Sequence, residues 1–365
     1  MNESVRHIIR IIIGQFEGRC PLLPFHPKGG RGLLFCFTLL VLSVLLISGW
    51  SDASGAVTAC VSVRSLPEEN ALRLAAASTL VGSVVMFLIN PAIVQTFYGA
   101  VDLGEDATRA MISLCAALLT TVLWSGATRA FGLPTSESHA LVSAMSGAAV
   151  AATGRITVIH TNAWGRILLG FTISVFCPFF LGFLCNRTLH ALLSKRNRRR
   201  ALSRFGRSQR FSACWSAAMT GAQDCQKFMG VYLLGLSMCG IGTESTLSLL
   251  PSLLLLSAAV MSMGTMLGSS HVIKKLGRDM VSLDAPDYSA AGAASTAVLT
   301  LCTCLGLPAS ITHTRTSAFV GAGARKRRHI NLHVVFQVLG TWILTFPICA
   351  LFGFLLTLGF LIPFG

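Results

Sequence analysis

The sequence contains few charged side chains for its length. Of 365 residues, 29 are Lys or Arg and 14 are Asp or Glu, whereas hydrophobic residues make up 53% of the chain. So little charge excludes an ordinary soluble domain, and so much apolar side chain excludes a disordered one. Alternating segments of about ten residues, which a transmembrane barrel needs, are also lacking. Several apolar stretches instead approach the ~20 residues that cross a bilayer as a helix, so we predict an all-α polytopic membrane protein.

Paired cysteine motifs are missing as well. The 12 cysteines are scattered, mostly in apolar stretches, which argues against a disulfide framework or a cysteine metal site. Residues 1–32 show no signal-peptide cleavage pattern, and their apolar part is too short to span a membrane. We therefore predict an amphipathic, basic N-terminal segment that lies on the membrane surface.

The net charge of +15 is concentrated in the middle of the chain, where nine Lys and Arg residues and no acidic residue lie between Cys185 and Phe211. Such a segment is typical of nucleic-acid or acidic-lipid binding, or of a cytoplasmic loop that follows the positive-inside rule. In so apolar a chain we favour a basic cytoplasmic loop over 186–211 and expect no nucleic-acid partner. The N-terminal segment is also basic, and its orientation is left open.

One polar motif occurs twice. Gly-Leu-Pro-Thr-Ser-Glu-Ser-His at 132–139 is followed 174 residues later by Gly-Leu-Pro-Ala-Ser-Ile-Thr-His at 306–313. Two weaker echoes, around Asp52 and Asp224 and around Pro178 and Pro347, occur in the same order. We infer two homologous repeats, 33–185 and 212–365. The stretches 134–152 and 308–324 are too short for full spans, so each repeat is predicted to contain a re-entrant hairpin.

Asp52 and Asp224 lie in apolar, small-residue surroundings. A carboxylate at membrane depth costs at least ~2.5 kcal/mol, so it normally faces a partner or a cavity. One such aspartate is explained by a buried salt bridge, and Lys227 is available to Asp224. Two aspartates at equivalent positions of the two repeats favour a cation-coupling site, which would also include Ser51 and Gln223 beside them. The metal we would assign to Asp52 and Asp224 is sodium. We expect each helix to open at its aspartate, where glycines are near.

The duplicated motif has the features of an anion site. Proline is tolerated in the first turn of a helix, and hydroxyl groups just after it would stand beside unpaired backbone N–H groups. The candidate anion ligands are the hydroxyl groups of Ser136, Ser138, Ser310 and Thr312. The alternative is a pair of proline-kinked helices whose hydroxyls bind neighbouring helices, and the duplication favours the anion site.

Three other residues of these motifs could carry a proton or contact the anion. They are Glu137, His139 and His313. A buried histidine is at least as often a structural hydrogen-bonding group. An ionised Glu137 would repel an anion, whereas a protonated one could donate a hydrogen bond to it.

Two segments resemble the inorganic phosphate transporter (PiT) family. Residues 220–230, Thr-Gly-Ala-Gln-Asp-Cys-Gln-Lys-Phe-Met-Gly, are similar to its Gly-Ala-Asn-Asp-Ala-Gln-Lys-x-Met-Gly signature, and 306–313 resemble its Gly-Leu-Pro-Val-Ser-Thr-Thr-His segment. The resemblance covers about 35–363. It implies two inverted repeats that move phosphate with sodium or protons, cations around Asp52 and Asp224, and phosphate at the four hydroxyls. Ser51 and Gln223 replace the family's asparagines, and Glu137 replaces a threonine or similar residue.

We therefore expect a secondary active transporter of inorganic phosphate, coupled to a sodium or proton gradient, with alternating access at the repeat interface. It would be no enzyme and would need no cofactor. One alternative is transport of another oxyanion such as sulfate. A second is a membrane phosphatase of a lipid-linked pyrophosphate, although no apolar helix carries two glutamates a turn apart. Compact size and the lack of organelle signals favour a multi-pass protein of a bacterial plasma membrane, and a homodimer is compatible with the sequence.

Overall fold

The computed structural model describes residues 30–62, 64–193, 198–241, 243–268, 280–281, 283–324 and 330–364. These residues form helices and no strand, with two isolated β-bridges, Val101 to Ile159 and Val281 to Ile330. In the first half of the chain the helices are α2 (Gly30–Ser62), α3 (Glu68–Ile89), α4 (Ala92–Tyr98), α5 (Ala107–Ala130), α6 (Glu137–Thr153), the short 3-10 helix η1 (Ile156–Val158) and α7 (Thr161–Leu193). In the second half they are α8 (Arg198–Met238), α9 (Thr243–Leu267), α11 (Ala285–Cys304), α12 (Ile311–Ala324) and α13 (Leu332–Phe364).

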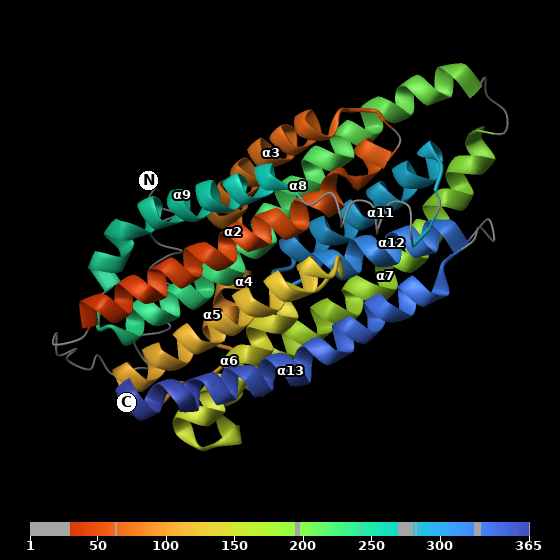
Figure 1. Ribbon diagram of the computed structural model, residues 1–365. Helices are drawn as coiled ribbons and strands as arrows, with labels where there is room; N and C mark the ends of the chain where they lie inside the picture. Colours follow the sequence, from red (N-terminus) through yellow and green to blue (C-terminus); the bar gives the residue numbers. More distant parts are fainter. Residues whose placement is uncertain are drawn as a thin grey trace.

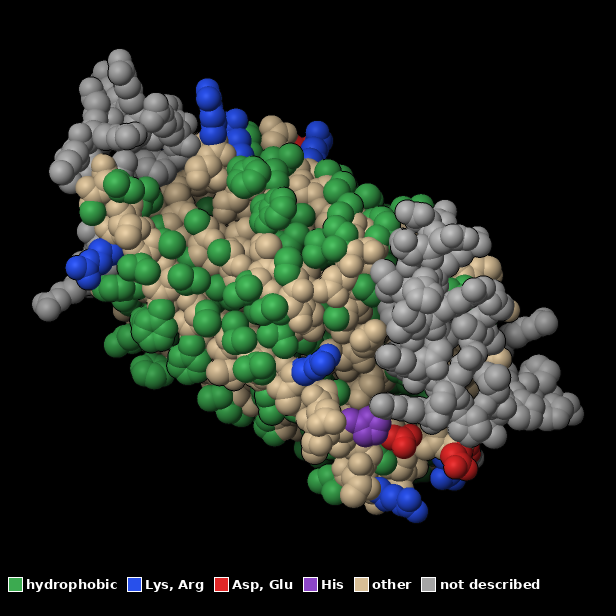
Figure 2. All heavy atoms as spheres, turned by 180° about the vertical axis from the view of Figure 1, so that it is seen from behind, with side chains coloured by type: hydrophobic (Ala, Val, Ile, Leu, Met, Phe, Trp, Pro, Cys, Tyr) green, Lys and Arg blue, Asp and Glu red, His purple; other side chains and the backbone are tan. Residues whose placement is uncertain are grey.

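The outer surface of this helical body is apolar. Within the described residues, six helices are long and apolar enough to cross a membrane: α2, α3, α5, α7, α9 and α13. Large hydrophobic side chains such as Phe176 and Ile343 are mostly exposed on them, and Figure 2 shows apolar side chains covering much of one face. Because a bilayer rather than water covers such a surface, the protein is the multi-pass α-helical membrane protein that the composition predicts.

The two halves of the chain interleave. The short helix α6 packs against α13, and its counterpart α12 packs against α7, so each is held by the long helix of the other half. In the same way α3 packs on α8, and α2 on α9. In Figure 1 the α5–α6 pair lies towards the lower left and α11–α12 towards the upper right, and the tips of both pairs meet in the middle. The boundaries 33–185 and 212–365 thus mark halves of one body, and their inverted relationship stays a prediction.

The helices that carry the aspartates are unbroken. α2 and α8 run without interruption through Asp52 and Asp224, so the predicted opening at these residues is wrong. The glycines nearby allow close helix packing instead. A Cβ on Gly49 would lie 2.0 Å from the main-chain oxygen of Met261, and one on Gly221 would lie 2.3 Å from that of Thr79. A glycine that permits a helix break and one that permits close helix packing look alike in a sequence.

One other segment differs from the sequence-based expectation. The predicted basic loop 186–211 is largely helical, because α7 continues to Leu193 and α8 begins at Arg198, with 194–197 outside the described residues. The predicted N-terminal segment 1–32 lies almost wholly outside the described residues.

Candidate functional site

The same local sequence ends the first helix of each pair. Gly132 and Gly306 have φ of +64° and +65°, the left-handed conformation that glycine adopts at little cost. The next residue bonds back to the helix, as Leu133 N–H does to the Thr128 carbonyl at 2.9 Å, and the proline that follows cannot continue it. The chain then extends for a few residues before α6 or α12 begins.

The helices α6 and α12 begin at the same place, N-terminus to N-terminus. The Ser136 hydroxyl oxygen accepts the His139 N–H at 3.4 Å, and the Ser310 oxygen accepts the His313 N–H at 3.4 Å. The Ser310 hydroxyl also donates to the Ser136 hydroxyl at 2.9 Å. The partially positive ends of both helices are therefore directed at one point.

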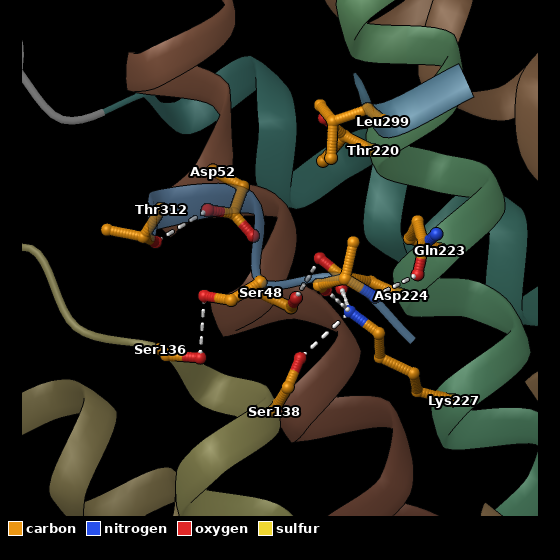
Figure 3. Close-up of polar contacts among 12 residues, drawn as sticks. Ser48, Asp52, Ser136, Ser138, Thr220, Gln223, Asp224, Lys227, Leu299 and Thr312 are labelled. Carbon is orange, nitrogen blue, oxygen red and sulfur yellow. Dashed lines mark hydrogen bonds and ion pairs between the residues drawn. The ribbon is translucent and has the colours of Figure 1, made fainter. Parts of the chain in front are cut away.

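The other two predicted hydroxyls lie beside this contact. Ser138 accepts a hydrogen bond from the Lys227 ammonium at 2.8 Å. Thr312 donates to the main-chain oxygen of Thr135 at 2.8 Å, and its hydroxyl is 3.5 Å from Asp52 Oδ1. All four predicted anion-binding hydroxyls are buried and gather in one region, which the close-up in Figure 3 shows around Ser136, Ser138 and Thr312.

Asp224 is held in a dense set of polar contacts. Its Oδ1 lies 2.9 Å from Lys227 Nζ, and its Oδ2 accepts from the Ser48 hydroxyl at 3.0 Å. Lys227 Nζ also donates to the main-chain oxygen of Ala309 at 2.7 Å and points into the cluster in Figure 3. The salt bridge considered as the alternative explanation of Asp224 is thus present. A cation at Asp224 would first have to displace the ammonium group.

Asp52 has weaker contacts of its own. Its carboxylate interacts electrostatically with those of Asp224 and Glu137 and with the Arg315 guanidinium. Arg315 Nη1 donates to the main-chain oxygen of Asp52 at 2.6 Å. Three carboxylates thus stand near three cationic side chains, and the formal charges balance when all six are ionised. The six residues are Asp52, Asp224, Glu137, Lys227, Arg129 and Arg315.

The two residues that precede the aspartates lie in different settings. Gln223 Nε2 donates to the Thr303 hydroxyl at 3.1 Å and to the Leu307 carbonyl at 3.2 Å, and its Oε1 accepts from the Ala309 N–H at 3.0 Å. Gln223 therefore fixes the loop before α12. Ser51, by contrast, lines a cavity together with Asp52.

Glu137 forms an ion pair that the sequence analysis missed. Its Oε1 lies 3.2 Å from Arg129 Nη2, both side chains are 5% exposed, and the Trp50 ring lies 4.5 Å from the Arg129 guanidinium. Arg315 is equally buried, and the sequence analysis did not select it either. The signal was available for both, because an arginine within a small-residue membrane segment is as costly as an acid and requires a partner.

The two histidines face aromatic rings rather than the hydroxyl groups. The His139 and His313 ring centroids are 4.4 Å apart. His139 also contacts Phe171 and Phe346, at 4.0 and 4.5 Å, and His313 contacts Trp342 at 3.7 Å. None of their four ring nitrogens has a hydrogen-bond partner among the described residues. The structure therefore brings the two imidazole rings together but gives these rings no polar contact with the hydroxyl cluster.

A small cavity adjoins the hydroxyl cluster. Its volume is about 10 Å³, room for roughly one water molecule. Its polar lining includes Ser51, Asp52, Ser125, Arg129, Thr312 and Arg315. Among the described residues, no three or more His, Cys, Asp or Glu side chains come together as a metal site would require. A monovalent cation would thus have to use the Asp52 carboxylate and neighbouring hydroxyl oxygens.

Comparison with known proteins gives one consistent result. A model of the phosphate transporter family matches residues 48–206 and 190–353. A probable low-affinity inorganic phosphate transporter of Bacillus subtilis is 27% identical over 327 residues, which are 88% of this chain and 96% of that protein. A protein of the same description from Mycobacterium tuberculosis strain H37Rv is 28% identical over 329 residues, covering 88% of this chain and 76% of that one.

A solved structure has the same fold. The protein described as "The sodium-dependent phosphate transporter" superposes with a TM-score of 0.75 at 18% identity, covering 91% of this chain and 99% of that one.

Proposed function

This chain belongs to the phosphate transporter family, and from that premise we propose that it is a secondary active transporter that couples phosphate movement to a cation gradient. Phosphate transport itself follows from the family and from the relatives, which are named as transporters and not as enzymes. The phosphatase alternative is therefore set aside. The relatives named above are bacterial, in keeping with a place in a bacterial plasma membrane.

The observation that carries the proposal is the meeting of two helix N-termini in the interior. Such an end presents unpaired N–H groups and partial positive charge, and it binds phosphate without any arginine or lysine. Here two such ends meet through the Ser136–Ser310 hydrogen bond at 2.9 Å. A phosphate that replaced this bond would be held by Ser136, Ser138, Ser310 and Thr312 from both halves of the chain.

The cation would bind next to this anion. Thr312 lies within reach of Asp52, so a cation on Asp52 and Ser51 would stand one side chain away from the phosphate. Each ion then lowers the electrostatic cost of the other, and this coupling is reciprocal. Asp224 would bind the cation as well once the Lys227 ammonium has moved away from its carboxylate. The name of the structural neighbour supports sodium, although that name describes the neighbour alone.

Alternating access would follow from the interleaved packing. Because α6 is held by α13 and α12 by α7, each tip can move with a different group of helices. Separation of the tips on one side and then on the other would expose the same site alternately to both faces of the membrane.

Uptake of labelled phosphate into proteoliposomes tests the proposal. Sodium and proton gradients are imposed separately, and sulfate is added as competitor. We expect phosphate to accumulate under one of the gradients with little effect of sulfate. Absence of uptake under both gradients would reject the proposed coupling, and strong sulfate competition would favour the broader oxyanion alternative.

A further inference from the structure

Three buried hydrogen-bond donors without a partner line the cavity beside the hydroxyl cluster. They are Arg129 Nη1, Arg315 Nε and the Ser125 hydroxyl, and none has a partner among the described residues. Arg129 is 6% exposed, and the other two are 2% exposed. An unsatisfied buried donor costs ~1–3 kcal/mol, and more when it is charged. Three of them around one cavity indicate a ligand that accepts hydrogen bonds and carries negative charge.

We propose that Arg129, Arg315 and Ser125 form a second binding position for phosphate. This position lies beside the hairpin tips, which are the N-terminal ends of α6 and α12, and phosphate occupies it on one side of these tips during transport. This position, the arginine station, rests on the proposed function because it assumes that phosphate passes through the hairpin tips. It adjoins the four hydroxyls, because Thr312 lines the same cavity, but none of its three donors belongs to that set.

The chemistry of the two arginines suits a tetrahedral oxyanion. A guanidinium presents several N–H donors in one plane, so it can keep its protein partners and still donate a charge-assisted hydrogen bond to an anion through a free N–H. Arg315 is held in place by the Asp52 carbonyl at 2.6 Å and the Thr220 hydroxyl at 2.6 Å, which leaves its Nε free. Gly55 makes room for it, because a Cβ there would lie 2.7 Å from Arg315 Cδ.

The station lies on one side of the hairpin tips only. The duplication relates positions 174 residues apart, so Arg129 corresponds to Thr303 and Arg315 to Leu141. Neither counterpart is cationic. Arg315 also lines a second cavity, with Gln209, Ser212 and Thr296 among its other lining residues. Arg315 thus lines both cavities, whereas Arg129 lines the first one alone.

The cavity is too small for phosphate in the conformation seen. A cavity of about 10 Å³ has room for a water molecule but not for phosphate. Arg129 is joined to Glu137 by one contact of 3.2 Å, and both Arg129 Nη1 and Glu137 Oε2 lack a partner among the described residues. Because this ion pair is only half formed, Arg129 can turn part of its guanidinium towards an anion. Asp52 also lines the cavity, and its charge opposes phosphate until a cation or Arg315 compensates it.

The variant Ser125→Ala tests the station. The Ser125 hydroxyl makes no hydrogen bond with described residues in the conformation seen, so its loss should leave folding unchanged. The matched control is Ser113→Ala, also in α5 and buried, whose hydroxyl bonds to the main-chain oxygens of its own helix. Transport is measured in right-side-out and in everted membrane vesicles over a range of phosphate concentrations.

We expect Ser125→Ala to raise the phosphate KM by roughly tenfold to a hundredfold from one side of the membrane, through the loss of one hydrogen bond to a charged ligand. The KM from the other side should stay unchanged, and Ser113→Ala should match wild type on both sides. An equal KM change from both sides, or from neither, would overturn the arginine station.

A second measurement separates this inference from the proposed function. Equilibrium binding of labelled phosphate to the purified full-length protein in detergent requires no ion gradient. If wild type binds phosphate and Ser125→Ala binds it roughly tenfold to a hundredfold more weakly, the station stands even when coupled uptake fails. If Ser125→Ala binds phosphate as wild type does, the station is rejected even when uptake is normal.

Discussion

Replacement of Lys227 by methionine should destabilise the protein strongly and tests the role of Asp224. Lys227 Nζ holds Asp224, Ser138 and the Ala309 carbonyl at 2.7–2.9 Å and is 1% exposed. Methionine keeps the length of the apolar part of the lysine side chain but leaves the Asp224 charge buried and unpaired. Removing one partner of a buried ion pair costs about 3–5 kcal/mol. The free energy of unfolding, measured by detergent titration in mixed micelles, should fall by about that amount.

The double variant Asp224→Asn with Lys227→Met distinguishes a structural aspartate from one that couples transport. With both charges removed, no buried charge is left unpaired, so the double variant should recover most of the lost stability. We expect it to fold and yet to show no cation-driven phosphate uptake, because Asp224 has lost its carboxylate. If the double variant takes up phosphate with the cation dependence of wild type, Asp224 serves only to bind Lys227 and the coupling role is refuted.

Three further predictions concern single positions. Gly55→Ala should lower both stability and uptake, because its methyl group would collide with Arg315, whereas Gly126→Ala, with nothing within 4 Å, should match wild type in both. Ser310→Ala removes a helix N-cap and the contact between the two tips, so the free energy of unfolding should fall by about 1 kcal/mol and the phosphate KM should rise from both sides; an unchanged KM would remove Ser310 from the site. Glu137→Gln leaves the Arg129 charge without its partner, so the free energy of unfolding should fall by about 3–5 kcal/mol; the folded variant should lose any proton-driven uptake and keep sodium-driven uptake, and proton-driven uptake at the wild-type rate would clear Glu137 as the proton carrier.

The helix end and new helix start in each copy of the motif, and the hydroxyl cluster, could be predicted because their chemistry is local and repeated, whereas the re-entrant character of these segments stays a prediction. The glycine at position 132 or 306, the proline two residues later and the hydroxyls that follow specify a helix end, a turn and a new helix start within eight residues. The duplication then indicated that both starts belong to one site. The structure brings all four hydroxyls together, while their role in binding phosphate stays a prediction.

Other parts of the site depend on contacts between distant residues, which one sequence does not reveal. Arg315 lies against Gly55, 260 residues earlier in the chain, and neither residue alone predicts the other. Gly49 and Gly221 suggested helix breaks because small residues near an aspartate are also found where a helix opens. Only the packing of α2 on α9 and of α3 on α8 shows that they serve close contact.

The central claim is that phosphate passes between the two opposed helix starts. It is tested most directly by initial rates of labelled phosphate uptake into proteoliposomes under an imposed sodium gradient, for wild type and for the double variant Ser136→Ala with Ser310→Ala. We predict gradient-driven accumulation by wild type and a phosphate KM at least about tenfold higher in the folded double variant, which lacks both capping hydroxyls. Uptake by the double variant with the wild-type KM would contradict the claim.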